Sequence, residues 1–81
     1  MNREEVMTRL QTVFDDVFLE PVKLSPQLTA KDVPEWTSLA HISLLLSVEK
    51  EFGIRFRVGE VEKMQNIGEF VDLILERLKE H

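Results

Sequence analysis

The sequence predicts an all-α fold, a small antiparallel bundle of three main helices with a short helix as the third in order. Three stretches carry apolar residues at the spacing of an amphipathic helix, and no stretch alternates apolar and polar residues as a strand does. One long connection, between the first two helices, suits a bundle with a single crossover. The 81 residues are expected to form one domain, residues 1–81.

The first helix is predicted to begin after Asn2 and to end near Phe18, ahead of Pro21. Asn2 and Glu5 have the spacing of a capping box, in which each side chain accepts a hydrogen bond from the other residue's backbone N–H. The apolar residues that follow at helical spacing are Val6, Leu10, Val13, Phe14 and Val17.

The connection over residues 19–37 contains three prolines and is longer than a small domain normally tolerates without anchors. We therefore expect its apolar residues to pin it to the core. These residues are Leu24, Leu28, Val33 and Trp36.

The second helix is predicted to begin at Thr37 or Ser38 and to end at Gly53, which can adopt the left-handed conformation that stops a helix. Its core face is expected to consist of Leu39, Ile42, Leu45, Val48 and Phe52. Its exposed face is expected to consist of Ala40, Ser43, Ser47 and Lys50.

A short helix of one or two turns is predicted over residues 59–64. Asn66 and Glu69 then repeat the spacing of a capping box ahead of the most regular apolar pattern in the chain. The residues of that pattern are Ile67, Phe70, Val71, Ile74, Leu75 and Leu78.

The composition excludes several classes of function. Ten Lys and Arg against 15 Asp and Glu give a formal charge of −5, the wrong sign for a protein that binds nucleic acid. The chain has no cysteine, so any thiol chemistry needs a thiol brought by a cofactor. The longest apolar run, residues 44–46, is far too short for a membrane span, and the N-terminus lacks the apolar core of a signal peptide. A cytoplasmic protein is expected.

Ser38 is the first candidate for chemistry, because it lies at the predicted start of the second helix. The free N–H groups and partial positive charge of a helix N-terminus accommodate an attached phosphate. Ser and Thr are also favoured N-caps, so the position alone leaves a purely structural role open.

The sequence contains no motif for a catalytic site or for a metal site. His41 shares a helix face with Ser38, but no local motif supplies the orienting group and oxyanion site of a Ser–His nucleophile. We expect His41 to be half-buried and hydrogen-bonded. The acidic pairs have no accompanying histidine and no calcium-loop spacing, so no metal site is predicted.

The residues Trp36-Thr37-Ser38-Leu39 and the segment EKEFGI at 49–54 resemble the acyl carrier protein family. In that family an Asp-Ser-Leu motif opens the second helix, and a similar Glu-x-Glu-Phe-Gly-Ile segment closes it. Residues 28–33 resemble the loop before the motif, residues 60–64 the short third helix and residues 66–78 the last helix. The resemblance covers nearly the whole chain.

The resemblance implies that Ser38 carries a 4′-phosphopantetheine arm, transferred from coenzyme A by a phosphopantetheinyl transferase. The arm would bring the missing thiol and carry acyl or aminoacyl groups as thioesters to acyl-loading, acyl-transferring or condensing enzymes. Such a protein is a carrier and not an enzyme. The walls of the acyl slot are expected to be Leu39, Ile42, Leu45 and Ile67.

Two departures from the family pattern concern partners. The acid before the serine is Thr37 here, a weaker ligand than a carboxylate for the Mg²⁺ of the transferase, which predicts slow modification or a dedicated transferase. The predicted exposed face of the second helix, usually acidic, has no carboxylate, which indicates a specialised lipid or secondary-metabolite pathway. The docking residues are expected to be Thr37, Leu39, Leu46 and Glu49, with rim charges at Glu35, Glu60 and Glu62.

Two other hypotheses remain open. An unmodified helical interaction module would bind a partner through Leu39 and Leu46, with Ser38 only a helix N-cap whose replacement by alanine costs about 1 kcal/mol. A small hydrolase would use Ser38 and His41 to cleave a generic ester without a cofactor.

Overall fold

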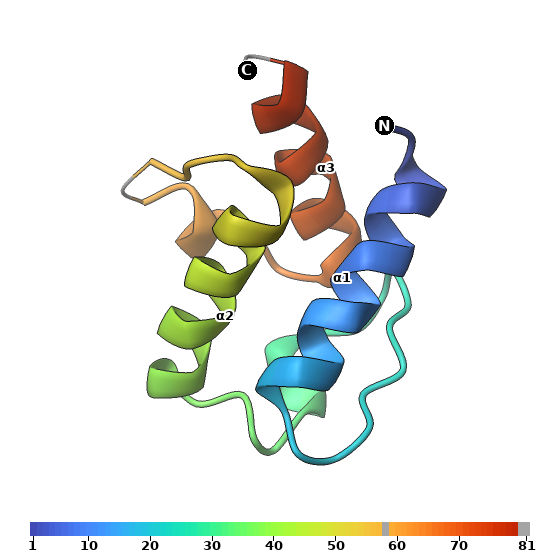
Figure 1. Ribbon diagram of the computed structural model, residues 1–81. Coiled ribbons are helices and arrows are strands. Elements are labelled where there is room, and N and C mark those ends of the chain that lie inside the picture. Colours follow the sequence, from blue (N-terminus) through green and yellow to red (C-terminus); the bar gives the residue numbers. More distant parts are fainter. Residues whose placement is uncertain (58, 80–81) are drawn as a thin grey trace.

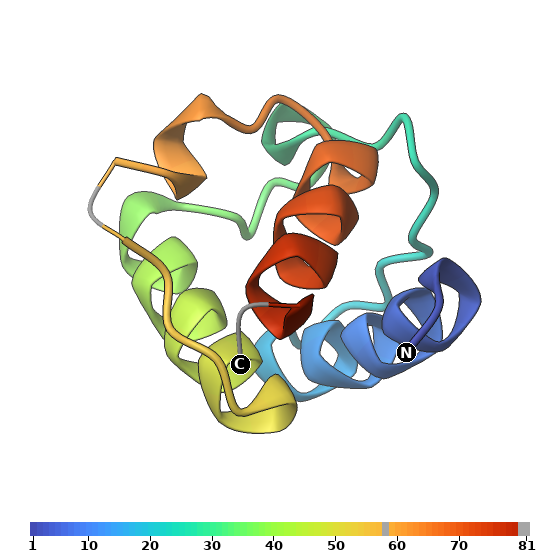
Figure 2. The same ribbon diagram turned by 90° about the horizontal axis from the view of Figure 1, so that it is seen from above.

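The computed structural model describes residues 1–57 and 59–79. Within them, three α-helices make the bundle, α1 (Arg3–Val17), α2 (Ser38–Phe52) and α3 (Ile67–Lys79), and no strand occurs. In Figure 1, α1 runs downward while α2 and α3 run upward, so α1 is antiparallel to both. The view from above shows the three helices around a shared interior (Figure 2). The predicted all-α antiparallel bundle is confirmed.

Helix α1 begins as its sequence predicts. The side-chain oxygen of Asn2 accepts the N–H of Glu5 at 2.8 Å, and the carboxylate of Glu5 accepts the N–H of Asn2 at 3.5 Å. This capping box satisfies two backbone donors that the first turn would otherwise leave unpaired. The buried face of the helix consists of Val6, Leu10, Val13 and Phe14.

The long connection between α1 and α2 is anchored to the core, as expected. Val33 is buried, and Leu24, Leu28 and Trp36 pack against the core. Val22, which the sequence did not single out, is buried as well. The side chain of Gln11 in α1 fixes this part of the loop by donating to the carbonyl of Val22 at 2.6 Å and accepting the N–H of Leu24 at 3.1 Å.

The expected core face of α2 is right at Val48 and Phe52 but wrong at Leu39 and Ile42. The buried residues are Leu44, Val48 and Phe52, whereas Leu39 is 76% exposed and Ile42 is 57% exposed. Leu45 is only half-buried, and Ala40, expected in solvent, packs against the core. The run of three leucines at 44–46 fits several faces of the helix equally well, so periodicity cannot select the one that contacts α1 and α3.

The predicted short helix over residues 59–64 is smaller than expected. It is a single 3₁₀ turn, η2 (Val61–Lys63), and a second such turn, η1 (Ala30–Asp32), precedes α2. The three main helices and the short one together would make a four-helix bundle, and that expectation is wrong, since the part of the chain described holds three α-helices. Val61 is the only buried residue of η2, too little apolar contact to offset the cost of nucleating a longer helix.

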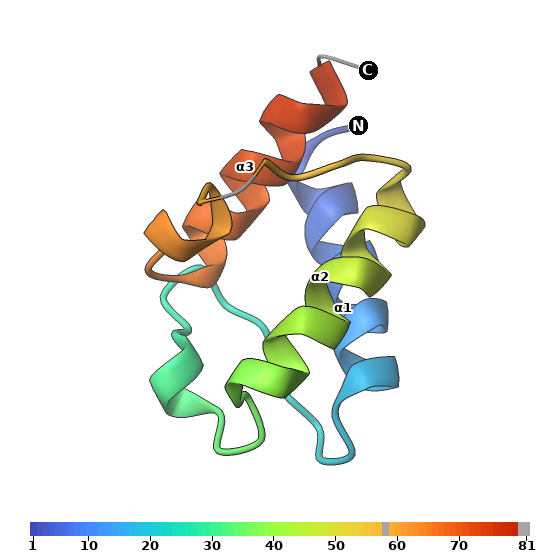
Figure 3. The ribbon, with the colours of Figure 1, turned by 90° about the vertical axis from the view of Figure 1, so that its left-hand side faces the viewer.

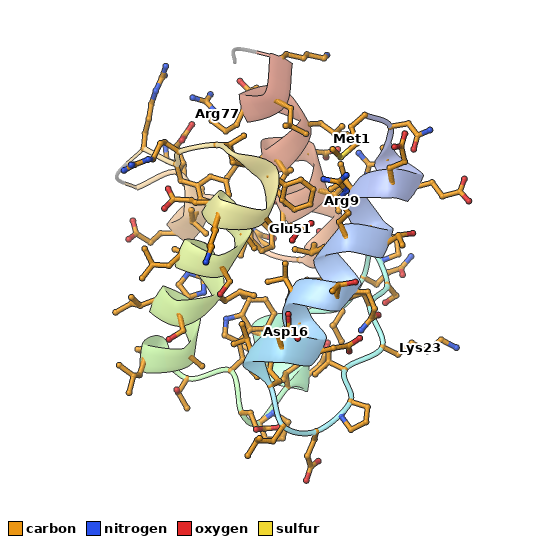
Figure 4. The ribbon with its side chains drawn as sticks, in the orientation of Figure 1. Met1, Arg9, Asp16, Lys23, Glu51 and Arg77 are labelled. Carbon is orange, nitrogen blue, oxygen red and sulfur yellow. The ribbon has the colours of Figure 1, made fainter. Side chains whose placement is uncertain are left out.

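Ion pairs connect elements that are distant in sequence (Figure 4). Arg77 of α3 is only 9% exposed, and its Nη2 lies 3.3 Å from Oε2 of Glu60, the residue directly before η2. Arg9 of α1 lies 3.9 Å from Glu51 of α2. The first pair fixes η2 against α3, and the second lies between α1 and α2.

Helix α3 starts at the residue predicted from its capping pattern. Oδ1 of Asn66 accepts the N–H of Glu69 at 2.9 Å, and the carboxylate of Glu69 accepts the N–H of Gln65 rather than that of Asn66. The carbonyls of Leu28 and Pro26 accept the first two N–H groups of the helix, each at 2.9 Å. A Cβ at Gly68 would lie 3.2 Å from the Pro26 carbonyl oxygen, so glycine allows this close approach of loop and helix.

Candidate functional site

The cap of α2 is Thr37 and not Ser38. Thr37 has extended backbone angles, and its Oγ1 accepts the N–H of Ala40 at 3.2 Å. Ser38 is the first helical residue, it is exposed, and its hydroxyl makes no hydrogen bond to any residue that the structure describes. The hypothesis that Ser38 is only a helix N-cap is therefore wrong. Its hydroxyl is accessible for chemistry.

The start of α2 is braced against the end of α1. The carboxylate of Glu35 accepts the backbone N–H groups of Glu20 at 2.9 Å and of Leu19 at 3.3 Å. The carbonyl of Glu35 accepts the N–H of Thr37 at 2.9 Å. Figure 3 shows the end of α1 and the beginning of α2 at the same end of the bundle. These bonds fix the backbone on which Ser38 is mounted.

His41 is half-buried and hydrogen-bonded, as expected. The indole N–H of Trp36 donates to Nδ1 of His41 at 2.9 Å, and the two rings stack with centroids 6.0 Å apart at 25°. Because an indole nitrogen can only donate, Nδ1 of His41 is the acceptor of this bond. His41 is thus bound to Trp36 and not to Ser38, which gives the hydrolase hypothesis no nucleophile pair.

A groove of about 360 Å³ runs along α2 and faces the segment that follows it. We call it the α2 groove. Ile42 and Leu45 line it, as expected for the acyl slot, together with His41, Phe56 and Val61. Ile67 instead lies fully buried in the core, and Leu39 projects into solvent, so neither is among the groove residues. Phe56 was not predicted as a wall, because it follows Gly53 in a segment without helical spacing that would mark which side chains face α2.

The expected docking residues divide into two groups. Leu39 is 76% exposed and Leu46 is 62% exposed, and with Ile42 they form a stripe along α2 that we call the leucine stripe. Glu49 is half-buried, and its carboxylate accepts the N–H of Phe56 at 2.8 Å. Glu35 and Glu60 are likewise held by backbone N–H groups, so these expected rim charges also support the fold.

Residues 1–57 and 59–79 contain no cluster of three or more His, Asp or Glu side chains arranged to bind a metal ion. None of their helices has both the length and the apolar character needed to cross a membrane.

Comparison with known proteins gives consistent matches. No family model matches the chain. It is 25% identical over 75 residues to the acyl carrier protein of Thermosynechococcus vestitus, covering 91% of this chain and 93% of that one. It is 27% identical over 77 residues to the acyl carrier protein of Rubrobacter xylanophilus, covering 94% and 95%. The solution NMR structure of the holo acyl carrier protein from Geobacter metallireducens matches with a TM-score of 0.76 and 31% identity, over 96% of this chain and 86% of that one.

The chain is a helical bundle with an exposed serine at the start of its second helix, and it matches acyl carrier proteins over nearly its whole length. These features define a carrier protein rather than an enzyme. Such a protein holds a prosthetic group and presents its cargo to other proteins. The chain belongs to the acyl carrier protein family.

Its cofactor is covalently bound 4′-phosphopantetheine, as the resemblance implied. The residues at the start of α2 fit this group. Ser38 is exposed, its hydroxyl makes no hydrogen bond within the described chain, and Thr37 already caps the helix, so esterification of Ser38 would break no hydrogen bond there. The N–H groups of the first turn suit the negative charge of a phosphodiester.

Proposed function

We propose that Ser38 is the attachment residue for the 4′-phosphopantetheine arm and that residues 1–81 act as one carrier domain. The observation that carries the proposal is the exposed, unbonded hydroxyl of Ser38 beside a helix cap made by Thr37. A serine that served as the cap would have its oxygen occupied by a backbone N–H. When bound, the arm supplies the terminal thiol on which acyl or aminoacyl thioesters form.

The chain's own residues orient the arm and shelter the cargo. Oγ of Ser38 becomes the ester oxygen of the phosphodiester, on backbone held by Glu35. The α2 groove offers apolar walls at Ile42, Leu45 and Phe56. Transfer of an alkyl chain from water to such walls is favourable by about 0.8 kcal/mol per buried methylene. Ile67 belongs to the buried core and does not line the groove.

The docking surface for partner enzymes is proposed to be Thr37, Leu39, Leu46 and Glu49. Its support is the leucine stripe, an exposed apolar row on a helix whose remaining solvent face carries Ser43 and Lys50. Exposed apolar patches of this kind mark protein interaction sites. The partners are a phosphopantetheinyl transferase and the enzymes that load, transfer or condense the acyl group.

The pathway is proposed to be a specialised lipid or secondary-metabolite pathway. Its support is the neutral residue Thr37 directly before Ser38, together with the absence of an acidic side chain from the leucine stripe. An apolar docking surface favours partners with a matching apolar patch over partners that are attracted by charge.

Intact-mass measurement tests the attachment. The protein is incubated with coenzyme A, Mg²⁺ and a broad-specificity phosphopantetheinyl transferase. We expect a gain of one phosphopantetheine, absent in Ser38→Ala and retained in Ser43→Ala, which changes an exposed serine on the same helix. No gain with several transferases, or a gain that persists in Ser38→Ala, would refute the proposal.

A further inference from the structure

We infer that His41 determines which cargo the acyl slot accepts, because its imidazole separates the α2 groove from a second cavity. The inference rests on the proposed attachment of the arm at Ser38 and concerns the cargo at that same site. It assigns His41 a role in specificity and none in catalysis.

Two cavities meet at His41. One is the α2 groove, whose walls are mainly apolar. The other, of about 240 Å³, lies between Trp36, Met64 and the polar residues Gln65 and Asn66, and we call it the loop cavity. Three residues line both: His41, Val61 and Glu62. The cavities therefore share a boundary, and the His41 side chain is part of it.

The position of the imidazole is fixed by a row of rings that reaches into the core. Trp36 donates its indole N–H to His41 and stacks on it. Trp36 and Phe14 pack in a T-shaped arrangement, with ring centroids 5.4 Å apart, and Phe14 is fully buried. Rotation of His41 away from the boundary would break the hydrogen bond and the stack, leaving the indole N–H without its acceptor.

The opposite side of the boundary is fixed as well. Val61 is 6% exposed, and it begins the turn that the Glu60–Arg77 pair holds against α3. Neither His41 nor Val61 can move without the loss of a specific contact. The partition is thus a stable part of the fold.

The partition limits the length of an acyl chain. His41 follows Ser38 by one helical turn, and helical side chains lean toward the N-terminus, so the imidazole stands close to the attachment point. A chain that enters the α2 groove finds the way to the loop cavity closed. A chain longer than the groove must leave its last methylenes in water, where they add nothing to stability.

The experiment varies chain length and the side chain at 41. Wild-type protein, His41→Ala and His41→Phe are each loaded from a series of acyl-coenzyme A thioesters, butanoyl to dodecanoyl, with Mg²⁺ and a broad-specificity transferase. Intact mass verifies loading. The Tm of each acylated form is then compared with the Tm of the same variant carrying the arm without an acyl group, so a general loss of stability cancels.

In wild-type protein, Tm rises with chain length and levels off at a limiting length. In His41→Ala the rise continues to longer chains, by roughly 3–6 °C for each further methylene that is buried. His41→Phe, which keeps a ring at the boundary but cannot accept the indole hydrogen bond, retains the wild-type limit. His41→Asn can still accept the indole N–H but lacks the ring, so it moves the limit in the same direction as His41→Ala and replaces that variant if it does not fold.

Equal limits in wild type and His41→Ala would overturn the inference, as would a wild-type Tm that does not respond to chain length. A limit that moves equally in His41→Phe would also overturn it, because the bulk of the ring would not be what closes the boundary. Absence of the mass gain at Ser38 would be a different failure, that of the proposed attachment, and the inference would fall with it.

Discussion

Glu35 accepts the backbone N–H of Glu20 at 2.9 Å, across a separation of 15 residues in the chain. Through its carbonyl it also accepts the N–H of Thr37, the residue that caps α2. Glu35 therefore connects the turn after α1, through its side chain, to the N-cap of α2, through its backbone. The direction in which Ser38 presents its hydroxyl depends on this connection.

Replacement of Glu35 tests the connection. Glu35→Ala removes both side-chain hydrogen bonds, and we expect it to lower the free energy of unfolding by about 1–2 kcal/mol, because the acceptor is charged but only half-buried. Urea denaturation measures the change. Glu20→Ala, at an exposed neighbouring position, should change stability by less than about 0.5 kcal/mol. Similar losses in both variants would contradict the role of Glu35.

The assignment of the cap to Thr37 predicts opposite effects at two adjacent residues. Thr37→Ala should lower stability by about 1 kcal/mol, because the N–H of Ala40 loses its acceptor. Ser38→Ala should leave stability within about 0.5 kcal/mol of wild type. Thermal unfolding of the two unmodified variants measures both values. A larger loss in Ser38→Ala than in Thr37→Ala would contradict the assignment.

Thr37→Asp should restore a carboxylate beside Ser38 without loss of the cap, since Asp is also a favoured N-cap. Carboxylates bind Mg²⁺ better than a neutral hydroxyl does, so we expect faster attachment of phosphopantetheine by a broad-specificity transferase. The initial rate at limiting Mg²⁺ is the measurement. Thr37→Asn, a cap without the charge, is the matched control. Equal rates for Asp and Asn would show that the charge has no influence.

The pair of Arg77 and Glu60 should couple strongly. Arg77→Met removes the guanidinium that pairs with Glu60 and Glu76. Among the residues described, the carboxylate of Glu60 then keeps only the N–H of Arg57 in a mostly buried place, and the expected loss is about 3 kcal/mol, near the lower end for buried pairs. Glu60→Gln combined with Arg77→Met should cost less than the sum of the single changes. A double-mutant cycle by urea denaturation measures the coupling. Additive losses would place the contribution of Arg77 elsewhere.

The leucine stripe predicts a loss of binding without a loss of stability. Leu46→Ser should change the free energy of unfolding by less than about 0.5 kcal/mol, because Leu46 is 62% exposed. It should raise the KM of the transferase for the carrier, with little dependence on salt. Leu19→Ser, at a residue that is 95% exposed but outside α2, is the control and should behave as wild type. If Leu19→Ser raised the KM and Leu46→Ser did not, the docking surface would instead lie near the end of α1.

Much of the fold follows from local patterns in the sequence. The caps at Asn2 and Gly53 and the apolar spacing of α1 and α3 predict these elements at nearly their observed bounds. The orientation of α2 does not follow, because Leu44, Leu45 and Leu46 make the helix apolar on several sides. Only contact with α1 and α3 decides that Leu44 is buried.

The site could be predicted less completely than the fold. The motif around Ser38 marks it as a candidate attachment residue. Which of Thr37 and Ser38 caps the helix depends on backbone angles, which the sequence does not give. In the sequence Glu35 and Glu49 look like surface charges. Their carboxylates accept the N–H groups of Glu20 and Phe56, and only the tertiary structure brings these groups together. The burial of Arg77 has the same origin.

The stack of Trp36 on His41 has a practical consequence, because Trp36 is the only tryptophan in a chain without tyrosine. Intrinsic fluorescence therefore comes from one indole, two residues before Ser38. Any event that loosens the imidazole from that indole will change the emission spectrum, while events at the N-terminus of α1 or the C-terminus of α3 will leave the spectrum unchanged. The protein thus contains its own optical reporter at the place where its chemistry is proposed to occur.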